Sequence, residues 1–428
     1  MLTYSAARFG QGSSPPVADR ARGQLEPTYV FLVAITAYVV LQTLAILATS
    51  GLLKALSYAA AFGIVLAMAA MAAYLPKQRQ DVPLGFGIAL AFYYYGFVAS
   101  AALNFGTLDI VTALKMMLVP PFLVFGAAFE ASYRFKAWEL PSTKWLLAAL
   151  IILPAMLWFW QLASGKIEFG GIGGVSIFAN RNNAGLYAVT LIALLNVLRP
   201  QPLRNLLLYC LAGAAFGTLG VLLAVLTALT LAVGGKKTAL LIGAAAVVVS
   251  LILYFVPLEY GILSRIKPVI ASIKLIVDGR VDIATVTYGE LVRLLHTTDL
   301  SFLFRLKHWL NLWNLYTSAP LENIVFGFGV GGAARLSDTG LIPHNDYLRL
   351  LVECGPVTFA GFVAMIWLML KHCGRRWETV PLITVAIYFG SENLIDNFVA
   401  MALFFFCGGA MAYRLKAAMA SAKDGSTA

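Results

Sequence analysis

Long apolar runs separated by short polar segments make up most of this chain. Twelve runs approach or exceed the length at which a helix crosses about 30 Å of hydrocarbon. Two of them are irregular, because residues 203–234 can form one hairpin divided at 217–220, and 378–391 is short for a full span. The pattern predicts an all-α polytopic membrane protein with about twelve transmembrane helices, in a range of ten to thirteen. The runs are 28–49, 54–75, 83–103, 108–129, 145–164, 182–198, 203–219, 220–234, 238–256, 346–370, 378–391 and 397–413.

The composition of the whole chain agrees with residence in lipid. Of its 428 residues, 60% are hydrophobic and only 12% are charged, and the mean hydropathy is +0.82, whereas soluble domains are roughly half apolar. The net charge of +11 would suit a nucleic acid partner, but most of the 31 Lys and Arg residues lie in short loops between apolar runs. We therefore expect membrane lipids, and no nucleic acid, as partners.

The basic residues also predict the orientation, because positively charged loops stay on the cytoplasmic side during insertion. With both ends in the cytoplasm, eighteen basic residues fall inside, against Lys54, Lys166 and Arg181 in the short outer loops. The eighteen are Arg8, Arg20, Arg22, Lys77, Arg79, Arg134, Lys136, Lys144, Arg199, Arg204, Lys236, Lys237, Lys371, Arg375, Arg376, Arg414, Lys416 and Lys423.

This topology divides the chain into five parts. Residues 1–27 read as a flexible cytoplasmic tail, since they lack the compact apolar core of a cleaved signal peptide. Helices one to nine occupy 28–256, and 257–345 form one large periplasmic loop with short helices of its own. Helices ten to twelve occupy 346–414, and 415–428 form a second cytoplasmic tail.

The most distinctive residues lie in the predicted outer segments. Residues 301–316 have helical periodicity, which places Arg305 one turn before Trp309. Residues 326–361 then read FGFGVGGAARLSDTGLIPHNDYLRLLVECGPVTFAG, a Gly-rich turn followed by a His-Asn pair that opens a spanning helix. An earlier outer segment, at 178–185, reads FANRNNAG.

These segments together resemble the signature region of the O-antigen ligase and polymerase superfamily. HNDYLRLLVECG, preceded by FGFGVG and Arg305, carries the strong part of the resemblance, and FANRNNAG is similar to a looser pattern, Phe-x-Asn-x-Asn-x-x-Ala. The resemblance implies a membrane glycosyltransferase architecture of the large integral (GT-C-like) class and an inverting, metal-free transfer. It also implies an undecaprenyl-diphosphate-linked glycan as donor. The family's mid-chain Ser-Arg-Gly is replaced here by Gly-Thr-Leu-Gly at 217–220, so one usual phosphate ligand is absent or replaced.

His344 is the predicted catalytic residue. It lies where the outer loop meets the membrane, and a histidine with an ordinary pKa near 6.5 can accept a proton from a sugar hydroxyl. The alternative is that His344 and Asn345 only cap the helix that begins at Asp346, and the two roles are compatible. The other histidines, His296, His308 and His372, are interpreted as structural.

Arginines are the predicted ligands of the donor diphosphate, because a guanidinium offers a planar fork of donors to phosphate oxygens. Arg305 is the first candidate; the alternative is a surface arginine stacked on Trp309. The resemblance implies that more than one arginine takes part. Arg265, Arg181 and Arg293 are the further candidates.

Several residues are expected to support this site. Lys115 lies about two turns inside the fourth helix, where a charge is costly, so it should line a polar cavity or extend to the membrane surface; Pro120 and Pro121 should kink that helix. Asp346, Arg349 and Glu353 share one helix face and can form a chain of ion pairs. Glu392 and Asp396, on the last outer hairpin, are candidates to line a cavity.

Neither a metal nor a cofactor is expected. The chain has no GxGxxG after a strand, no P-loop and no DxD pair. The four cysteines lie in or beside apolar runs without a CxxC pair, which favours neither a disulfide nor a metal site. They are Cys210, Cys354, Cys373 and Cys407.

The sequence thus favours an O-antigen ligase, which moves a glycan from its lipid carrier to a sugar hydroxyl of a lipid A-core acceptor. An O-antigen or exopolysaccharide polymerase needs the same donor site and stays open. A membrane transporter is the alternative of another class, but the chain has no half-chain repeat and its long outer loop is atypical of alternating access. A scaffold of envelope assembly would require neither His344 nor Arg305.

Overall fold

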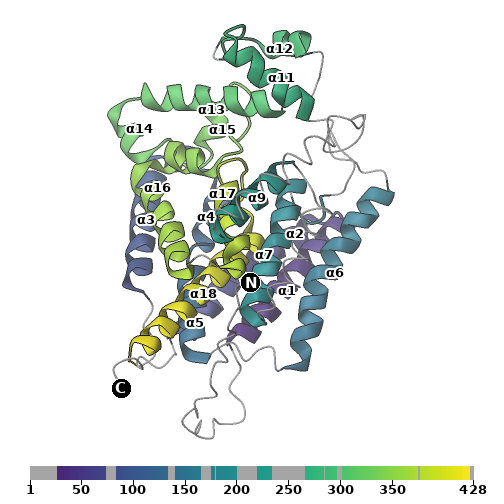
Figure 1. Cartoon of the computed structure of the whole chain (residues 1–428), viewed down its shortest axis with the longest axis vertical. Coiled ribbons are helices and arrows are strands. Elements are labelled where there is room, and N and C mark those ends of the chain that lie inside the picture. The colour runs from purple at the N-terminus through teal and green to yellow at the C-terminus, as the bar shows by residue number, and fades with distance from the viewer. Residues whose placement is uncertain are drawn as a thin grey trace, which may run out of the picture.

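The computed structural model describes residues 27–73, 83–133, 140–164, 175–178, 180–199, 219–233, 266–283, 285–295, 301–374 and 376–424. Within these ranges all regular secondary structure is helical, and most helices run side by side in one bundle (Figure 1). The predicted all-α class is confirmed for this part of the chain.

Seven spans of the described chain are long and apolar enough to cross a membrane. Each coincides with one of the predicted runs, so the chain is a polytopic membrane protein. The helices are α1 (Pro27–Leu47), α2 (Gly51–Ala73), α3 (Leu84–Leu103), α4 (Ile110–Leu118) continued by α5 (Phe122–Tyr133), α6 (Pro141–Ala163), α16 (Asp346–Cys373) and α18 (Phe398–Asp424).

Shorter helices complete the bundle. They are α7 (Arg181–Leu198), α9 (Leu219–Val233) and α17 (Val380–Tyr388), with 3-10 turns η2 (Phe105–Thr107) and η5 (Trp377–Thr379). At nine residues, α17 is shorter than a membrane span, in agreement with the short run at 378–391. Of the predicted span 203–219 only residue 219 is described, and the predicted span 238–256 lies outside the described residues.

Five helices from the predicted outer loop lie together at one end of the bundle (Figure 1). α13 (Ser301–Thr317) crosses that end, and α14 (Leu321–Phe326) and α15 (Gly332–Leu336) contact α16 beneath it. α11 (Ile266–Val277) and α12 (Tyr288–Leu295) lie beyond α13 and share a small apolar core with it, to which α13 contributes Leu303 and Leu306. α13 confirms the helix that the periodicity of 301–316 predicts.

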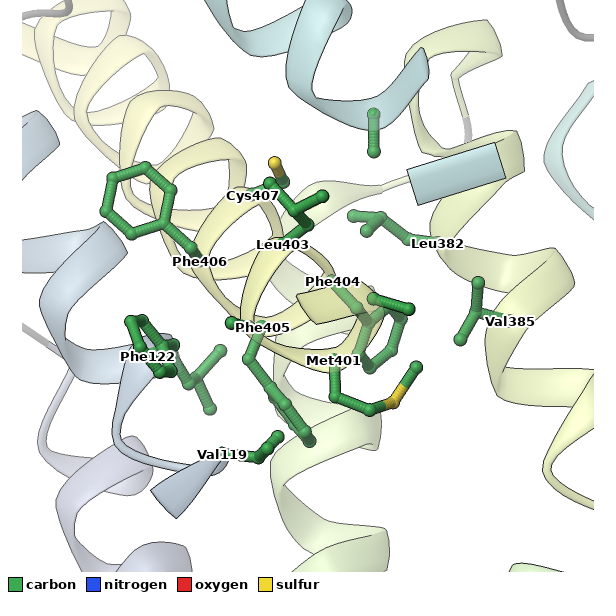
Figure 2. Close-up of a cluster of buried hydrophobic side chains, with 14 of the residues drawn as sticks. Val119, Phe122, Leu382, Val385, Met401, Leu403, Phe404, Phe405, Phe406 and Cys407 are labelled. Atoms are coloured by element: carbon green, nitrogen blue, oxygen red, sulfur yellow. The ribbon is translucent and has the colours of Figure 1, made fainter. Parts of the chain in front are cut away.

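The last spanning helix, α18, lies inside the bundle, with 83% of its most apolar stretch buried. Figure 2 shows its phenylalanines among side chains from α17 and from the α4–α5 segment. Glycines let the backbones approach: a Cβ on Gly126 would lie 2.0 Å from the carbonyl oxygen of Phe406, and one on Gly409 would lie 2.0 Å from that of Leu123. Small residues at such crossings are typical of helix packing in lipid.

Two prolines divide α4 from α5, as the sequence predicts. A proline removes the hydrogen bond to the carbonyl four residues earlier, so residues 120–121 free the carbonyls of Met116 and Met117. Tyr93 donates its hydroxyl to the first at 3.1 Å, and Tyr94 donates to the second at 2.5 Å. The break in α4–α5 is therefore stabilised by α3, because in hydrocarbon each freed carbonyl needs a partner from the protein.

A second break positions the start of α16. At 355–356 a Gly-Pro pair interrupts the helix, and the glycine has a φ of 77°, which favours glycine. The carbonyls of Val352 and Glu353 then accept hydrogen bonds from the amides of Phe328 and Gly329, each at 2.9 Å. The Gly-rich turn of the sequence motif is thus bound along the first part of α16, just below the His-Asn pair.

Candidate active site

The carboxylate of Glu392 is buried, and side chains from three other segments converge on it. His344 Nδ1 lies 2.6 Å from Oε1, and Arg305 Nη2 lies 3.5 Å from Oε2. Asn180 donates its amide to Oε1 at 3.3 Å, and Asn182 donates to Oε2. We call these five residues the Glu392 site. The site brings together residues from both motifs that carry the family resemblance. It also includes Arg305, which lies between these motifs in the sequence.

Helix starts position three of these side chains. Asn180 is the N-cap of α7, where its side chain accepts a hydrogen bond from the amide of Asn183 at 2.9 Å, and Asn182 follows in the first turn. His344 directly precedes Asn345, the N-cap of α16. An N-cap fixes where the helix begins, so the capping residues hold the adjacent side chains in place.

Glu392 itself lies beyond the helix ends, in the loop that links α17 to α18. Burial disfavours its charge and acts to raise its pKa. The hydrogen bond and charge of His344, the charge of Arg305 and the hydrogen bond from Asn182 outweigh burial, so the pKa of Glu392 lies below its ordinary value of 4.5. Glu392 is therefore ionised at neutral pH.

This ionised carboxylate determines which nitrogen of His344 carries the proton. A carboxylate only accepts hydrogen bonds, so Nδ1 of His344 donates to Glu392, and in the neutral imidazole it is Nε2 that carries the lone pair. The imidazole is 30% exposed, in contrast to the buried glutamate. The backbone of His344 has a φ of 46°, a conformation that a non-glycine residue adopts rarely and that clusters at functional sites. The arrangement provides an oriented base with one nitrogen available.

Arg305 combines contact with Glu392 and access to solvent. Its side chain is 27% exposed, so guanidinium donors that do not face Glu392 can meet a ligand. Trp309, one turn later on α13, donates its indole N–H to the carbonyl of Pro343, the residue before His344. Trp309 thus ties α13 to the segment that carries the histidine.

The other candidate arginines lie in different parts of the chain relative to Glu392. Arg181 is the first residue of α7, between the two asparagines of the Glu392 site, and is partly buried. Arg293 is exposed on α12, where it lines a shallow cleft with Glu290 and Asp282. It is not among the residues that contact Glu392. Arg265 lies outside the described residues.

A second buried polar group lies in α16 and the loop before α18. Arg349 Nε pairs with Glu353 at 3.2 Å, and its Nη1 lies 3.5 Å from Asp396. We call these three residues the Arg349 cluster. The predicted chain of ion pairs is correct for Arg349 and Glu353 but wrong for Asp346, which accepts the backbone amides of residues 394 and 395 at 2.5 and 2.9 Å. Asp346 thus binds the loop before α18, and Asp396 is the second acid that pairs with Arg349.

Asn345 performs the capping role that the sequence offers as an alternative. Its side chain accepts a hydrogen bond from the amide of Leu348 at 3.0 Å. The cap and the contact of His344 with Glu392 occur together. His308, interpreted as structural, is buried on α13, and its Nδ1 lies 3.5 Å from the hydroxyl of Ser337.

Lys115 lines a cavity of about 620 Å³. The cavity is one of the two placements that the sequence allows for this lysine. Lys54 lines the same cavity from α2, and Asn183 and Asp396 form part of its wall. We call it the lysine cavity. It adjoins the Glu392 site in sequence, since Asn183 follows Asn182.

The sequence does not predict that Glu392 lies at the centre of this group of side chains. An isolated acid on an outer hairpin has no motif around it, so the sequence suggests only that it lines a cavity. Its four partners lie between 48 and 212 positions away along the chain. Among the described residues, no group of three His, Cys, Asp or Glu side chains could hold a metal ion.

Comparison of the chain with models of known protein families gives no match, and comparison with curated proteins gives none either.

Proposed function

We propose that this protein is an O-antigen ligase, which transfers a glycan from an undecaprenyl-diphosphate carrier to a sugar hydroxyl of a lipid A-core acceptor. The observation that carries the proposal is the Glu392 site. One ionised carboxylate there contacts a partly exposed histidine, a partly exposed arginine and two asparagines from the segment FANRNN. Apart from Glu392, these residues lie in the segments on which the family resemblance rests.

The geometry suits an inverting transfer without metal. His344 Nε2 accepts the proton of the acceptor hydroxyl while the oxygen forms a bond to the anomeric carbon, and the bond from that carbon to the diphosphate oxygen breaks. The electron pair leaves with the carrier diphosphate, whose charge Arg305 stabilises. Glu392 holds the imidazole and stabilises the imidazolium that forms. This division of roles is the one in which a carboxylate orients a histidine base.

The proposal includes a topology of about twelve helices in the inner membrane, with both ends in the cytoplasm and the Glu392 site on the periplasmic side. The ends of the bundle differ in a way that supports this orientation. The basic residues Lys144, Lys371, Arg376 and Arg414 lie on helix ends opposite the Glu392 site, as the retention of positive loops in the cytoplasm requires. A lipid-linked donor fits a site that nucleotide sugars do not reach.

The test of catalysis is His344→Ala in the full-length protein, with transfer measured on purified donor and acceptor. We expect activity to fall by about 10²–10⁴-fold, the range for loss of a general base, with unchanged amounts in the membrane. Lys371→Gln, at the opposite end of α16, is the matched control and should retain activity. A His344→Ala variant with full activity would exclude the proposed chemistry, whereas a transporter would tolerate the substitution.

A deletion strain separates ligase from polymerase, which share the donor site. Loss of a ligase leaves bare lipid A-core, with long polymer stranded on the carrier. Loss of a polymerase leaves a single repeat attached to the core. Unchanged lipopolysaccharide would contradict both and indicate an exopolysaccharide as the product.

A further inference from the structure

The lysine cavity combines two cations from different helices. Lys54 lies in the first turn of α2, and Lys115 lies five residues into α4, roughly 8 Å along the helix. The volume of about 620 Å³ is within the range of about 300–1,000 Å³ that small-molecule sites occupy. The cavity is thus large enough for a headgroup and is positively charged on two sides.

The charges in the cavity wall do not cancel. Lys54 and Lys115 have no ion-pair partner in the described part of the chain; the Lys115 ammonium instead lies 5.0 Å from the centre of the Tyr58 ring. Asp396 is the acid in the wall; it lies 3.5 Å from Arg349, which also pairs with Glu353, and the two lysines exceed this single acid by one charge. Two cations beside a single acid leave a net positive charge in the cavity, which favours an anionic occupant.

Asn183 provides an independent indication of an occupant. It is only 5% exposed, it lines the cavity, and its Oδ1 is buried without a hydrogen-bond partner among the described residues. A buried polar atom without a partner is costly. An amide can also turn to present its NH₂ group instead of its oxygen, so a polar occupant could receive or donate a hydrogen bond here.

The apolar part of the wall indicates that the anion belongs to a lipid. Ile46, Phe178 and Val399 line the cavity beside the lysines. α2 forms its outer wall, and only 22% of the most apolar stretch of α2 is buried, so this helix lies at the edge of the bundle against lipid. A headgroup can enter past α2 while its chain remains in the bilayer.

We propose that the lysine cavity binds the phosphorylated headgroup of a lipid, with Lys54 and Lys115 on the phosphate oxygens and Asn183 as a further hydrogen-bonding partner. Under the proposed function, on which this step rests, the occupant is the diphosphate of the glycan carrier.

Equilibrium binding to the full-length protein tests the site. The protein is placed in phosphatidylcholine nanodiscs, and binding of undecaprenyl diphosphate is followed by native mass spectrometry, with undecaprenol as the probe without phosphate. We expect Lys54→Gln and Lys115→Gln each to weaken undecaprenyl diphosphate binding by about tenfold, since a charge-assisted hydrogen bond contributes on this scale. Lys115→Arg should keep most of the affinity. Lys274→Gln, on α11 at the same end of the molecule, is the matched control and should bind normally.

Competition identifies the source of the phosphate. If purified lipid A-core displaces undecaprenyl diphosphate at low concentration, the cavity binds the acceptor's phosphates. If lipid A-core does not compete, the cavity binds the carrier. Both outcomes retain a phosphorylated lipid substrate. Equal displacement by phosphatidylglycerol would overturn the assignment to a substrate. Normal binding by the Lys54→Gln, Lys115→Gln double variant, or equal binding of undecaprenol, would overturn the site itself.

The binding assay also separates this site from the proposed reaction. His344→Ala should lose transfer but bind the diphosphate normally. If the wild-type protein binds through the lysines but transfers no glycan, the proposed function fails and the lysine cavity stands. If transfer requires His344 but the lysine variants bind and react normally, the proposed function stands and the lysine cavity fails.

Discussion

The Glu392 site and the Arg349 cluster are both buried groups of opposite charges near the start of α16, yet they are organised in opposite ways. In the Glu392 site an acid is central, and its charged partners, His344 and Arg305, are 30% and 27% exposed. In the Arg349 cluster an arginine is central at 2% exposure, and its nearest partner, Glu353, is fully buried.

Under the proposed function, this difference separates a reactive arrangement from a structural one. The exposed groups of the Glu392 site can each meet a substrate while the buried acid holds them. The two members of the Arg349 cluster that come from α16, Arg349 and Glu353, are buried. Both carboxylate oxygens of Glu353 already have partners: Arg349 contacts one, and the amide of Ala333 donates to the other at 3.3 Å. We interpret the Arg349 cluster as a clamp that joins α16, the Gly-rich turn and the loop before α18.

The largest effect on folding should follow from Arg349→Ala. It leaves Glu353 buried without its cation, and breaking a buried pair in this way costs about 3–5 kcal/mol. We expect a strong loss of folded protein from the membrane, measured by abundance and by thermal unfolding in detergent. The double variant Arg349→Met, Glu353→Gln removes both charges and should recover much of the stability. A stable but inactive Arg349→Ala protein would show that this cluster belongs to the reactive site.

Glu392→Gln should reduce activity more than it reduces the amount of folded protein, the reverse of Arg349→Ala. Glutamine keeps the volume of the side chain but cannot stabilise an imidazolium or fix the histidine tautomer, so we expect transfer to fall by about 10–100-fold, toward the lower end of what loss of acid-base assistance costs. The amount of folded protein should fall far less than in Arg349→Ala, because glutamine keeps the volume of the buried side chain. A Glu392→Gln protein that loses its fold and not only its activity would remove the contrast between the two clusters.

The pH dependence of stability tests the charge of Glu392. Its pKa is lower in the folded protein than its ordinary value of 4.5, so its ionised form stabilises the fold fully above that pH. The contribution is lost as the pH falls from there through the lower folded-state pKa. Thermal unfolding between pH 3 and 7 should therefore show wild type losing more stability on acidification than Glu392→Gln. Parallel curves for the two proteins would contradict an ionised, stabilising Glu392.

Much of the helical framework could be predicted from the sequence because membrane spans are set by local composition and length. The prolines at 120–121 likewise act locally, so the break between α4 and α5 was predictable. Their partners on α3 were not, because nothing in the sequence around Tyr93 and Tyr94 shows which carbonyls their hydroxyls meet.

The site was predictable in its members but not in its connections. His344, Arg305 and the FANRNN segment stand out as motifs, whereas Glu392 has no motif and acquires its role only when distant segments converge on it. Asp346 illustrates the same limit. Helical spacing places it near Arg349, but the loop before α18 competes for its carboxylate with two backbone amides, and no local rule predicts that outcome.

The smallest effects come from a matched pair of helix caps. Asn180 and Asn345 each cap a helix through the same contact, at 2.9 and 3.0 Å, but only Asn180 also contacts Glu392. Replacing either by alanine should cost about 1 kcal/mol of stability. Asn180→Ala should in addition lower transfer severalfold, because the Glu392 carboxylate loses a hydrogen-bond donor. Thermal unfolding and transfer rates of the two variants, measured side by side, compare a cap alone with a cap that serves the site. Equal rates would mean that Asn180 contributes only to α7, and that the Glu392 site depends on fewer of its contacts than the geometry indicates.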